Sequence, residues 1–134
     1  MTKLNSYLSL IRFYNPIGFW LLLWPGLWGL FLSDNFNIEN FTIVVLGSFL
    51  TRSLGCAIND FLDRDFDKSV ERTKNRPIAS KELSLSEAGI FIILLASVCI
   101  FLLMQTNPYT IKLVSYVAIC LLYTSDAADE RRRG

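Results

Sequence analysis

Residues 41–67 read FTIVVLGSFLTRSLGCAINDFLDRDFD, an apolar run that changes abruptly into a cluster of aspartates. Between 41 and 58 the only charged residue is Arg52. Such a run approaches the roughly 20 apolar residues that a helix needs to cross a bilayer core. The stretch therefore predicts a membrane helix whose acidic end meets water.

The aspartates have a spacing that suits a metal ion. If the helix continues from Asn59 to about residue 69, Asp60, Asp63 and Asp67 stand at positions i, i+3 and i+7 on one helical face. Grouped carboxylates are suitable ligands for Mg²⁺, which is usually held by one or two of them together with substrate phosphates. The pattern predicts a magnesium and diphosphate site at a membrane surface.

Two further stretches are long and apolar. Residues 17–33 and 88–105 contain no charge, and a fourth apolar run begins near 111 and becomes polar after Tyr123. A soluble helical core is the alternative, but a chain of 134 residues is too small to bury three all-apolar helices inside a polar shell. We therefore expect an all-α membrane bundle with three full transmembrane helices and a fourth that is cut short.

Basic residues predict the orientation of these spans. The connections at 33–40 and 106–110 contain no Lys or Arg. Basic residues precede the first span and fill the loop after the second: Lys3, Arg12, Arg64, Lys68, Arg72, Lys74, Arg76 and Lys81. The positive-inside rule therefore puts the N-terminus and the Asp-rich loop in the cytoplasm.

Local signals mark where helices begin and end. Asn75-Arg76-Pro77 predicts a break, because the residue before proline avoids the α region. Residues 84–87, SLSE, fit a capping box at the start of the third span, and Asn107-Pro108 is typical of a turn. No repeat or low-complexity linker separates domains, which favours one membrane unit.

Several side chains have two interpretations. Arg52, within a span, either reaches a diphosphate held near Asp60 or extends its charge to the interface. Trp20, Trp24 and Trp28 form one helical stripe that either packs and anchors the helix or lines a substrate. Asp65 lies off the predicted metal face, so we expect it to be a solvated partner of Arg64 or Lys68.

Together these motifs resemble a known family. The Asn-Asp-x-x-Asp-x-x-x-Asp pattern at 59–67, with ERTKNRP at 71–77, resembles the first Asp-rich signature of the UbiA family of intramembrane aromatic prenyltransferases. RFYNPIG at 12–18 and LLLWP at 21–25 are similar to the branch that prenylates 4-hydroxybenzoate in ubiquinone synthesis, and RSLGCAI at 52–58 matches the approach to the Asp-rich segment of the family. The resemblance covers about residues 7–119.

The resemblance implies Mg²⁺-dependent transfer of a polyprenyl group from its diphosphate to the ring of 4-hydroxybenzoate. It implies a multi-pass protein of the bacterial inner membrane, in contact with lipid and with neither nucleic acid nor a protein partner. The implied Mg²⁺ ligands and catalytic residues are Asp60, Asp63 and Asp67. The implied diphosphate-binding residues are Asn59, Arg52, Arg72 and Arg76, although positive-inside charge also explains the last two.

The chain departs from the family after residue 119. A Tyr-Pro-x-x-Lys-Arg-like segment, a second Asp-rich motif and the rest of about nine helices are expected there and are absent. Residues 120–134 resemble the translation of a sequencing adapter, so we expect a native segment at 1–119, a non-native tail and no activity of the chain alone.

Other functions remain as alternatives. Naphthoate- and homogentisate-using relatives share the Asp-rich motif. A CDP-alcohol phosphotransferase also uses membrane-surface carboxylates, but its Asp-Gly start is absent. Phe61, Leu62 and Phe66 break the pattern of an EF-hand. The non-enzyme alternative is a basic scaffold segment that binds anionic lipid. The near balance of acidic and basic residues in the loop argues against it.

Overall fold

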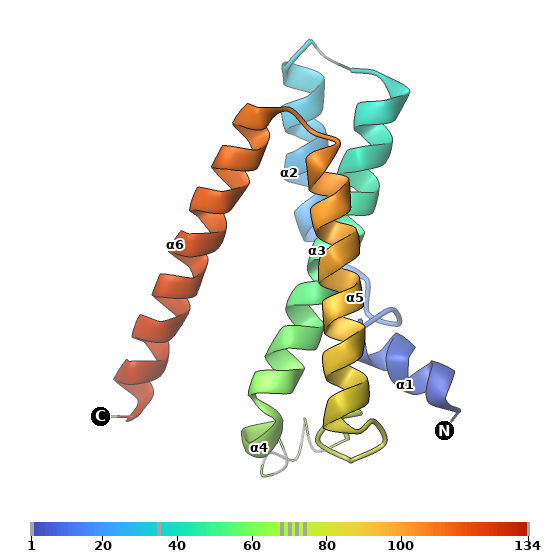
Figure 1. Cartoon of the computed structure of the whole chain (residues 1–134), viewed down its shortest axis with the longest axis vertical. Coiled ribbons are helices and arrows are strands. Elements are labelled where there is room, and N and C mark those ends of the chain that lie inside the picture. The colour runs from blue at the N-terminus through green and yellow to red at the C-terminus, as the bar shows by residue number, and fades with distance from the viewer. Residues whose placement is uncertain are drawn as a thin grey trace. The chain divides into compact units, whose positions relative to one another are not determined.

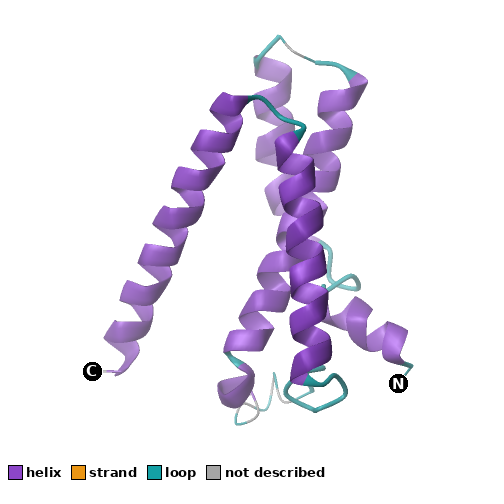
Figure 2. Ribbon diagram, in the orientation of Figure 1, coloured by secondary structure: helices purple, strands orange, loops and turns teal. Residues whose placement is uncertain are grey.

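The chain is helical wherever it is regular. The computed structural model describes residues 2–34, 36–67, 69, 71, 73 and 75–133, and within them it contains no strand. The helices are α1 (Lys3–Leu10), α2 (Ile17–Leu32), α3 (Ile38–Leu62), α4 (Arg64–Asp67), α5 (Leu85–Met104) and α6 (Pro108–Arg133) (Figures 1 and 2). The predicted all-α class is confirmed. The chain divides into two compact units, Met1–Ile100 and Phe101–Gly134.

The helices α2 and α3 form an antiparallel pair in the first unit (Figure 1). A small residue lets the two backbones approach, because a Cβ at Gly26 would lie 3.0 Å from Val44 Cγ1. Further along the pair, the rings of Phe19 and Phe49 meet edge to face with centroids 6.1 Å apart. This packing fixes one face of α2 against the helix that leads into the aspartates.

The predicted helix starts are seen in detail. At α5 the capping box is confirmed: the Glu87 N–H donates to Ser84 Oγ at 3.2 Å, and the Ser84 N–H donates to Glu87 Oε2 at 3.0 Å. The turn at Asn107-Pro108 is also confirmed, since α6 begins at Pro108 and Asn107 Oδ1 accepts the Thr110 N–H at 2.8 Å. Side-chain oxygens thus satisfy backbone donors at both starts.

The expected continuous helix from Asn59 to about residue 69 is wrong. The helix α3 ends at Leu62, Asp63 follows with ψ near 4°, and α4 is a single turn of 4 residues, Arg64–Asp67. Carboxylates three and four residues apart repel each other on a helix, and acidic groups disfavour a helix C-terminus. The same aspartates that suggested one shared face therefore interrupt the helix that would have displayed it.

A hydrophobic cluster surrounds the Asp-bearing end of α3. Its buried members are Leu10, Ala57, Ile78, Leu83 and Ala88. They come from α1, α3, the segment before α5, and α5 itself, so the cluster joins these segments into one unit.

Polar contacts at the edge of this cluster join α1 to the start of α5 and the segment before it. Lys3 pairs with Glu87, and the Ser6 hydroxyl donates to Glu82 Oε2 at 2.9 Å. The hydrogen bond with Glu87 raises the pKa of Lys3 above its usual value, so its ammonium stays charged at any physiological pH. α1 is therefore attached to the start of α5 by permanent charges as well as by apolar packing.

Among the residues that the structure describes, two helices are long and apolar enough to cross a membrane, namely α3 and α5. Few of their residues are buried, 17% and 6% of the most apolar windows. The span predicted at 17–33 corresponds to α2, which is apolar but only 16 residues long, and the apolar part of α6 is Pro108–Cys120. α6 itself continues to Arg133, across the predicted start of the tail, whose origin stays a prediction.

Candidate functional site

The three aspartates of the motif have different environments. The side chains of Asp60 and Asp67 are buried, with 2% and 9% exposed, whereas Asp63 is exposed. The break at Asp63 explains the difference, since the chain turns between the two buried carboxylates. Within the described part of the chain, no three His, Cys, Asp or Glu side chains are grouped closely enough to hold a metal ion. Of the three aspartates that were predicted to share one helical face, only Asp60 and Asp67 are brought together.

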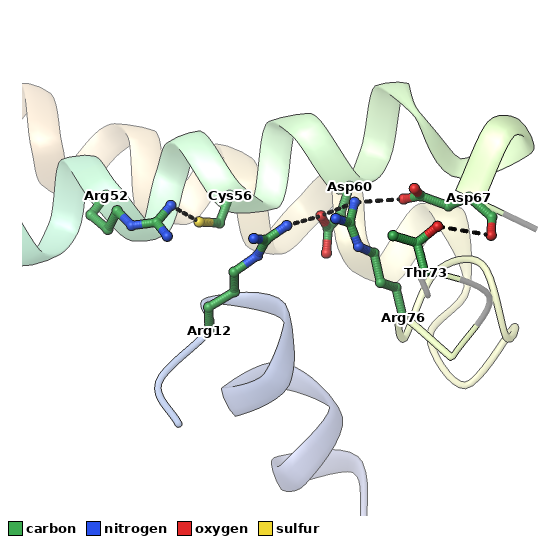
Figure 3. Close-up of polar contacts among 7 residues, drawn as sticks. All are labelled: Arg12, Arg52, Cys56, Asp60, Asp67, Thr73 and Arg76. Carbon is green, nitrogen blue, oxygen red and sulfur yellow. Dashed lines mark hydrogen bonds and ion pairs between the residues drawn. The ribbon is translucent and has the colours of Figure 1, made fainter. Parts of the chain in front are cut away.

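Arg76 joins the two buried aspartates. Its Nη1 lies 2.9 Å from Asp60 Oδ1 and 2.7 Å from Asp67 Oδ2, so one nitrogen is shared by two carboxylates (Figure 3). Arg76 lies in the segment between α4 and α5, whose described residues are not helical. The Thr73 hydroxyl of the same segment donates to the Asp67 carbonyl at 3.2 Å, which ties this segment to the end of α4.

Arg12 approaches Asp60 from the other side. Its Nη2 lies 3.3 Å from Asp60 Oδ1, reaching α3 from the turn after α1 (Figure 3). The turn is a Schellman motif, with the Phe13 N–H donating to the Leu8 carbonyl and the Arg12 N–H to that of Ser9. Arg12 occupies the position that normally takes glycine, and it has a left-handed φ of 54°.

The sequence prediction placed Arg12 among the flanking positive charges and at the start of the RFYNPIG motif, and it missed this contact with Asp60. The available signal was a basic residue at the position where a helix commonly ends in glycine. This signal could not predict the contact, because the sequence does not give the backbone angle φ that directs the side chain.

Arg52 lies on α3 two turns before Asp60, and it packs against α2. Its guanidinium contacts the sulfur of Cys56, and a Cβ at Gly18 would overlap the guanidinium. Only glycine at position 18 leaves room for this arrangement. Cys56 is buried and free.

Several of the side chains described above line a cavity of about 590 Å³. Its lining includes Arg12, Arg52, Asp60, Thr73 and Arg76. Three guanidinium groups against one carboxylate make this lining strongly positive. Arginine forks bind phosphate and carboxylate oxygens through paired hydrogen bonds, so the cavity has the chemistry of an anion site.

A second, apolar cavity of about 430 Å³ lies next to the first. It shares Arg12 and Arg52 with the cationic cavity, and its aromatic lining consists of Phe13, Phe19, Trp20 and Phe49. Of the tryptophan stripe, Trp20 lines this cavity, and all three tryptophans are at least half exposed within the chain. Charged groups and aromatic rings therefore meet at the two arginines.

The remaining predicted residues are less central. Asn59 is exposed, and its carbonyl accepts the Asp63 N–H at 2.9 Å. Asp65 is exposed and pairs with Arg64 at 3.6 Å, which confirms the predicted solvated pair. Arg72 lies outside the described residues.

The two buried carboxylates have the chemistry of a cation site. Asp60 and Asp67 direct one oxygen each to a single point, and a positively charged nitrogen already occupies that point. Hard carboxylate oxygens of this kind are ligands that Mg²⁺ prefers. The residues therefore fit a divalent ion, provided that Arg76 leaves the position between them.

Comparisons with known proteins give a matching family and several similar relatives. A sequence model of the UbiA prenyltransferase family matches residues 22–128. The 4-hydroxybenzoate octaprenyltransferase of Vesicomyosocius okutanii subsp. Calyptogena okutanii is 48% identical over 116 residues, covering 84% of this chain and 42% of the relative. The protein of the same name from Vibrio atlanticus is 43% identical over 125 residues, covering 91% of this chain and 43% of the relative.

A third relative, the 4-hydroxybenzoate octaprenyltransferase of Polynucleobacter asymbioticus, is 42% identical over 123 residues, covering 90% of this chain. The chain spans about two fifths of the length of these curated relatives. No solved structure matches the chain significantly.

Proposed function

Because the chain belongs to the UbiA prenyltransferase family, we propose that it supplies the diphosphate-binding part of an enzyme that prenylates 4-hydroxybenzoate for ubiquinone synthesis. Its relatives carry that activity in their names. The observation that carries the proposal is the cationic cavity, which Arg12, Arg52 and Arg76 line and in which two of these arginines contact the buried carboxylate of Asp60. A polyprenyl diphosphate brings the negative charge that such a lining requires.

Each residue near the cavity has a role in this proposal. Arg12, Arg52 and Arg76 bind diphosphate oxygens, and they hold the leaving group as its bond to the prenyl carbon weakens. Arg72, which lies outside the described residues, is also proposed to bind the diphosphate. Asp60 and Asp67, with Asp63 and the neighbouring Asn59, are the proposed ligands of Mg²⁺. Bound Mg²⁺ supplies Lewis-acid stabilisation of the departing diphosphate, worth several kcal/mol.

The apolar side of the site suits the other half of the substrate. The aromatic lining of the second cavity excludes water from a cation-like allylic group and offers ring faces to it. We assign 4-hydroxybenzoate as the acceptor because the similar relatives are named for it, in preference to naphthoate or homogentisate. The proposed location is the bacterial inner membrane, with lipid around α2, α3 and α5 and the Asp-rich loop in the cytoplasm.

A chimera tests the proposal. Residues 1–119 replace the matching segment of the Vesicomyosocius relative, and transfer of a radiolabelled prenyl group to 4-hydroxybenzoate is measured in membranes. We expect activity in the chimera and none in the chain alone. Asp60→Asn should lower the rate at least about tenfold, the usual scale for losing a metal-site group.

Asp65→Asn is the matched control, because Asp65 is an exposed member of the same motif and does not line the cationic cavity. It should keep the rate of the parent chimera. An Asp60→Asn chimera as fast as the Asp65→Asn chimera would refute the assigned site.

A further inference from the structure

Arg76 occupies the place that a cation takes between two carboxylates. Its Nη1 is 2.9 Å from Asp60 Oδ1 and 2.7 Å from Asp67 Oδ2, and both carboxylates are buried. Two buried like charges so close together need compensation, which this one guanidinium nitrogen provides to both at once. Arg12 adds a longer contact to Asp60 only, at 3.3 Å.

The same guanidinium also belongs to the cationic cavity. Arg76 lines that cavity together with Arg12 and Arg52, and 24% of its side chain is exposed. A flexible arginine side chain at this position therefore has two sets of anionic partners within reach, the aspartates on one side and any anion in the cavity on the other. It cannot remain between the aspartates if a divalent ion takes that point.

We propose that Arg76 is an exchangeable counter-ion, which neutralises Asp60 and Asp67 in the metal-free protein and transfers to the diphosphate when a divalent ion replaces it. The inference rests on the proposed function of the cavity and adds a coupling to it. Metal binding releases the guanidinium that the diphosphate needs, and the diphosphate holds that guanidinium away from the metal position. Each ligand thereby strengthens the binding of the other.

This exchange has a consequence that a merely structural arginine would not have. Replacing Arg76 by glutamine removes the competitor for the two carboxylates, so a divalent ion should bind more tightly in the absence of diphosphate. The same change removes a phosphate ligand, so diphosphate should bind more weakly. Opposite changes in the two affinities are the signature of exchange.

The first experiment measures Mn²⁺ binding to the full chain in detergent by equilibrium dialysis, without diphosphate. We expect Arg76→Gln to bind Mn²⁺ about fivefold or more tightly than the parent chain, within the usual range of coupling between sites. Inorganic pyrophosphate binding at fixed free Mn²⁺ should fall by a similar factor. Arg64→Gln is the matched control, since Arg64 pairs with exposed Asp65 and should change neither value.

The second experiment uses the unaltered chain, so it does not depend on the folding of a variant. Phenylglyoxal modifies accessible arginines, and mass spectrometry reports the extent at each position. Mn²⁺ should increase the labelling of Arg76 by releasing it from the aspartates, and added pyrophosphate should then protect it. Labelling of Arg64 should stay constant throughout.

The outcomes separate the inference from the function on which it rests. Equal or weaker Mn²⁺ binding by Arg76→Gln, with unchanged labelling of Arg76 in the parent chain, overturns the exchange and leaves the proposed function standing. Tighter Mn²⁺ binding without any pyrophosphate binding supports exchange at the aspartates and overturns the diphosphate assignment. If no Mn²⁺ binds to either protein, both the exchange and the proposed metal site are overturned.

Discussion

Two positions in this site, Arg12 and Gly18, have an unusual backbone angle or an unusually close contact. Arg12 has a left-handed φ of 54° at the end of α1, where glycine is the usual residue. Arg52 keeps its position because Gly18 has no Cβ. We therefore expect mutations that move Arg12 or Arg52 to change the site, even where they leave the number of arginines the same.

The strain at Arg12 predicts a difference between two substitutions. Arg12→Gly and Arg12→Ala both lose the contact with Asp60, but only glycine relieves the left-handed backbone. We expect the glycine variant to be more stable than the alanine variant by about 1 kcal/mol, from denaturation in detergent. Equal stability of the two variants would show that the backbone at residue 12 is not left-handed. Pyrophosphate binding should fall equally in both.

The close contact at Gly18 predicts a binding defect without a folding defect. Gly18→Ala places a Cβ where the Arg52 guanidinium lies, so the guanidinium must move. We expect pyrophosphate binding, measured by dialysis, to weaken about tenfold, the scale of one charge-assisted hydrogen bond.

Gly29→Ala is the control for Gly18→Ala on the same helix, since nothing lies within 4 Å of a Cβ there. It should leave binding unchanged and stabilise α2 slightly through helix propensity. If both variants bind pyrophosphate as the parent chain does, Arg52 has no part in the anion site.

At the scale of elements, helix starts were predictable and one helix end was not. The capping box at Ser84 needs only residues within one turn, so the sequence alone was enough to predict it. The end of α3 depends on how Asp63 and Asp67 share a helix with Asp60, and the shared-face prediction left out their mutual repulsion. Two aspartates converge as a result, and the third does not.

The capping box predicts a specific loss of stability. Ser84→Ala removes the oxygen that accepts the Glu87 N–H at the start of α5. We expect the free energy of unfolding in detergent to fall by about 1 kcal/mol. Ser86→Ala, in the same turn, should lower the free energy of unfolding by clearly less, because the Glu87 N–H donates to Ser84 Oγ and not to Ser86. Equal losses would mean that the cap does not stabilise α5.

At the scale of the whole molecule, the chain joins a cationic cavity to long apolar helices. Within the part that the structure describes, the buried core lies at the Asp-bearing end of α3, while most of α3 and α5 is not buried within the protein. Apolar surface of this extent needs lipid or further protein around it. A test of metal-dependent transfer therefore belongs in the chimera, in a membrane.

Metal removal should abolish transfer in the chimera of residues 1–119 with the Vesicomyosocius relative. After treatment with EDTA, we expect prenyl transfer to fall by at least about a hundredfold, because the lost Lewis acid contributes several kcal/mol. Added Mg²⁺ should restore the rate, and added Ca²⁺, which prefers more ligands at longer distance, should restore it poorly. A rate unaffected by EDTA would refute the magnesium assignment.

The sequence by itself determined the helical class, the helix starts, the family and the position of the Asp-rich motif. These features depend on composition, on periodicity and on contacts within a few residues. Only the tertiary structure decided that Arg12 and Arg76 flank Asp60, from positions 48 and 16 residues away in the chain. Such contacts depend on how α1, α3 and the segment before α5 pack around a common cluster, because side chains distant in sequence meet only when packing brings their backbones together.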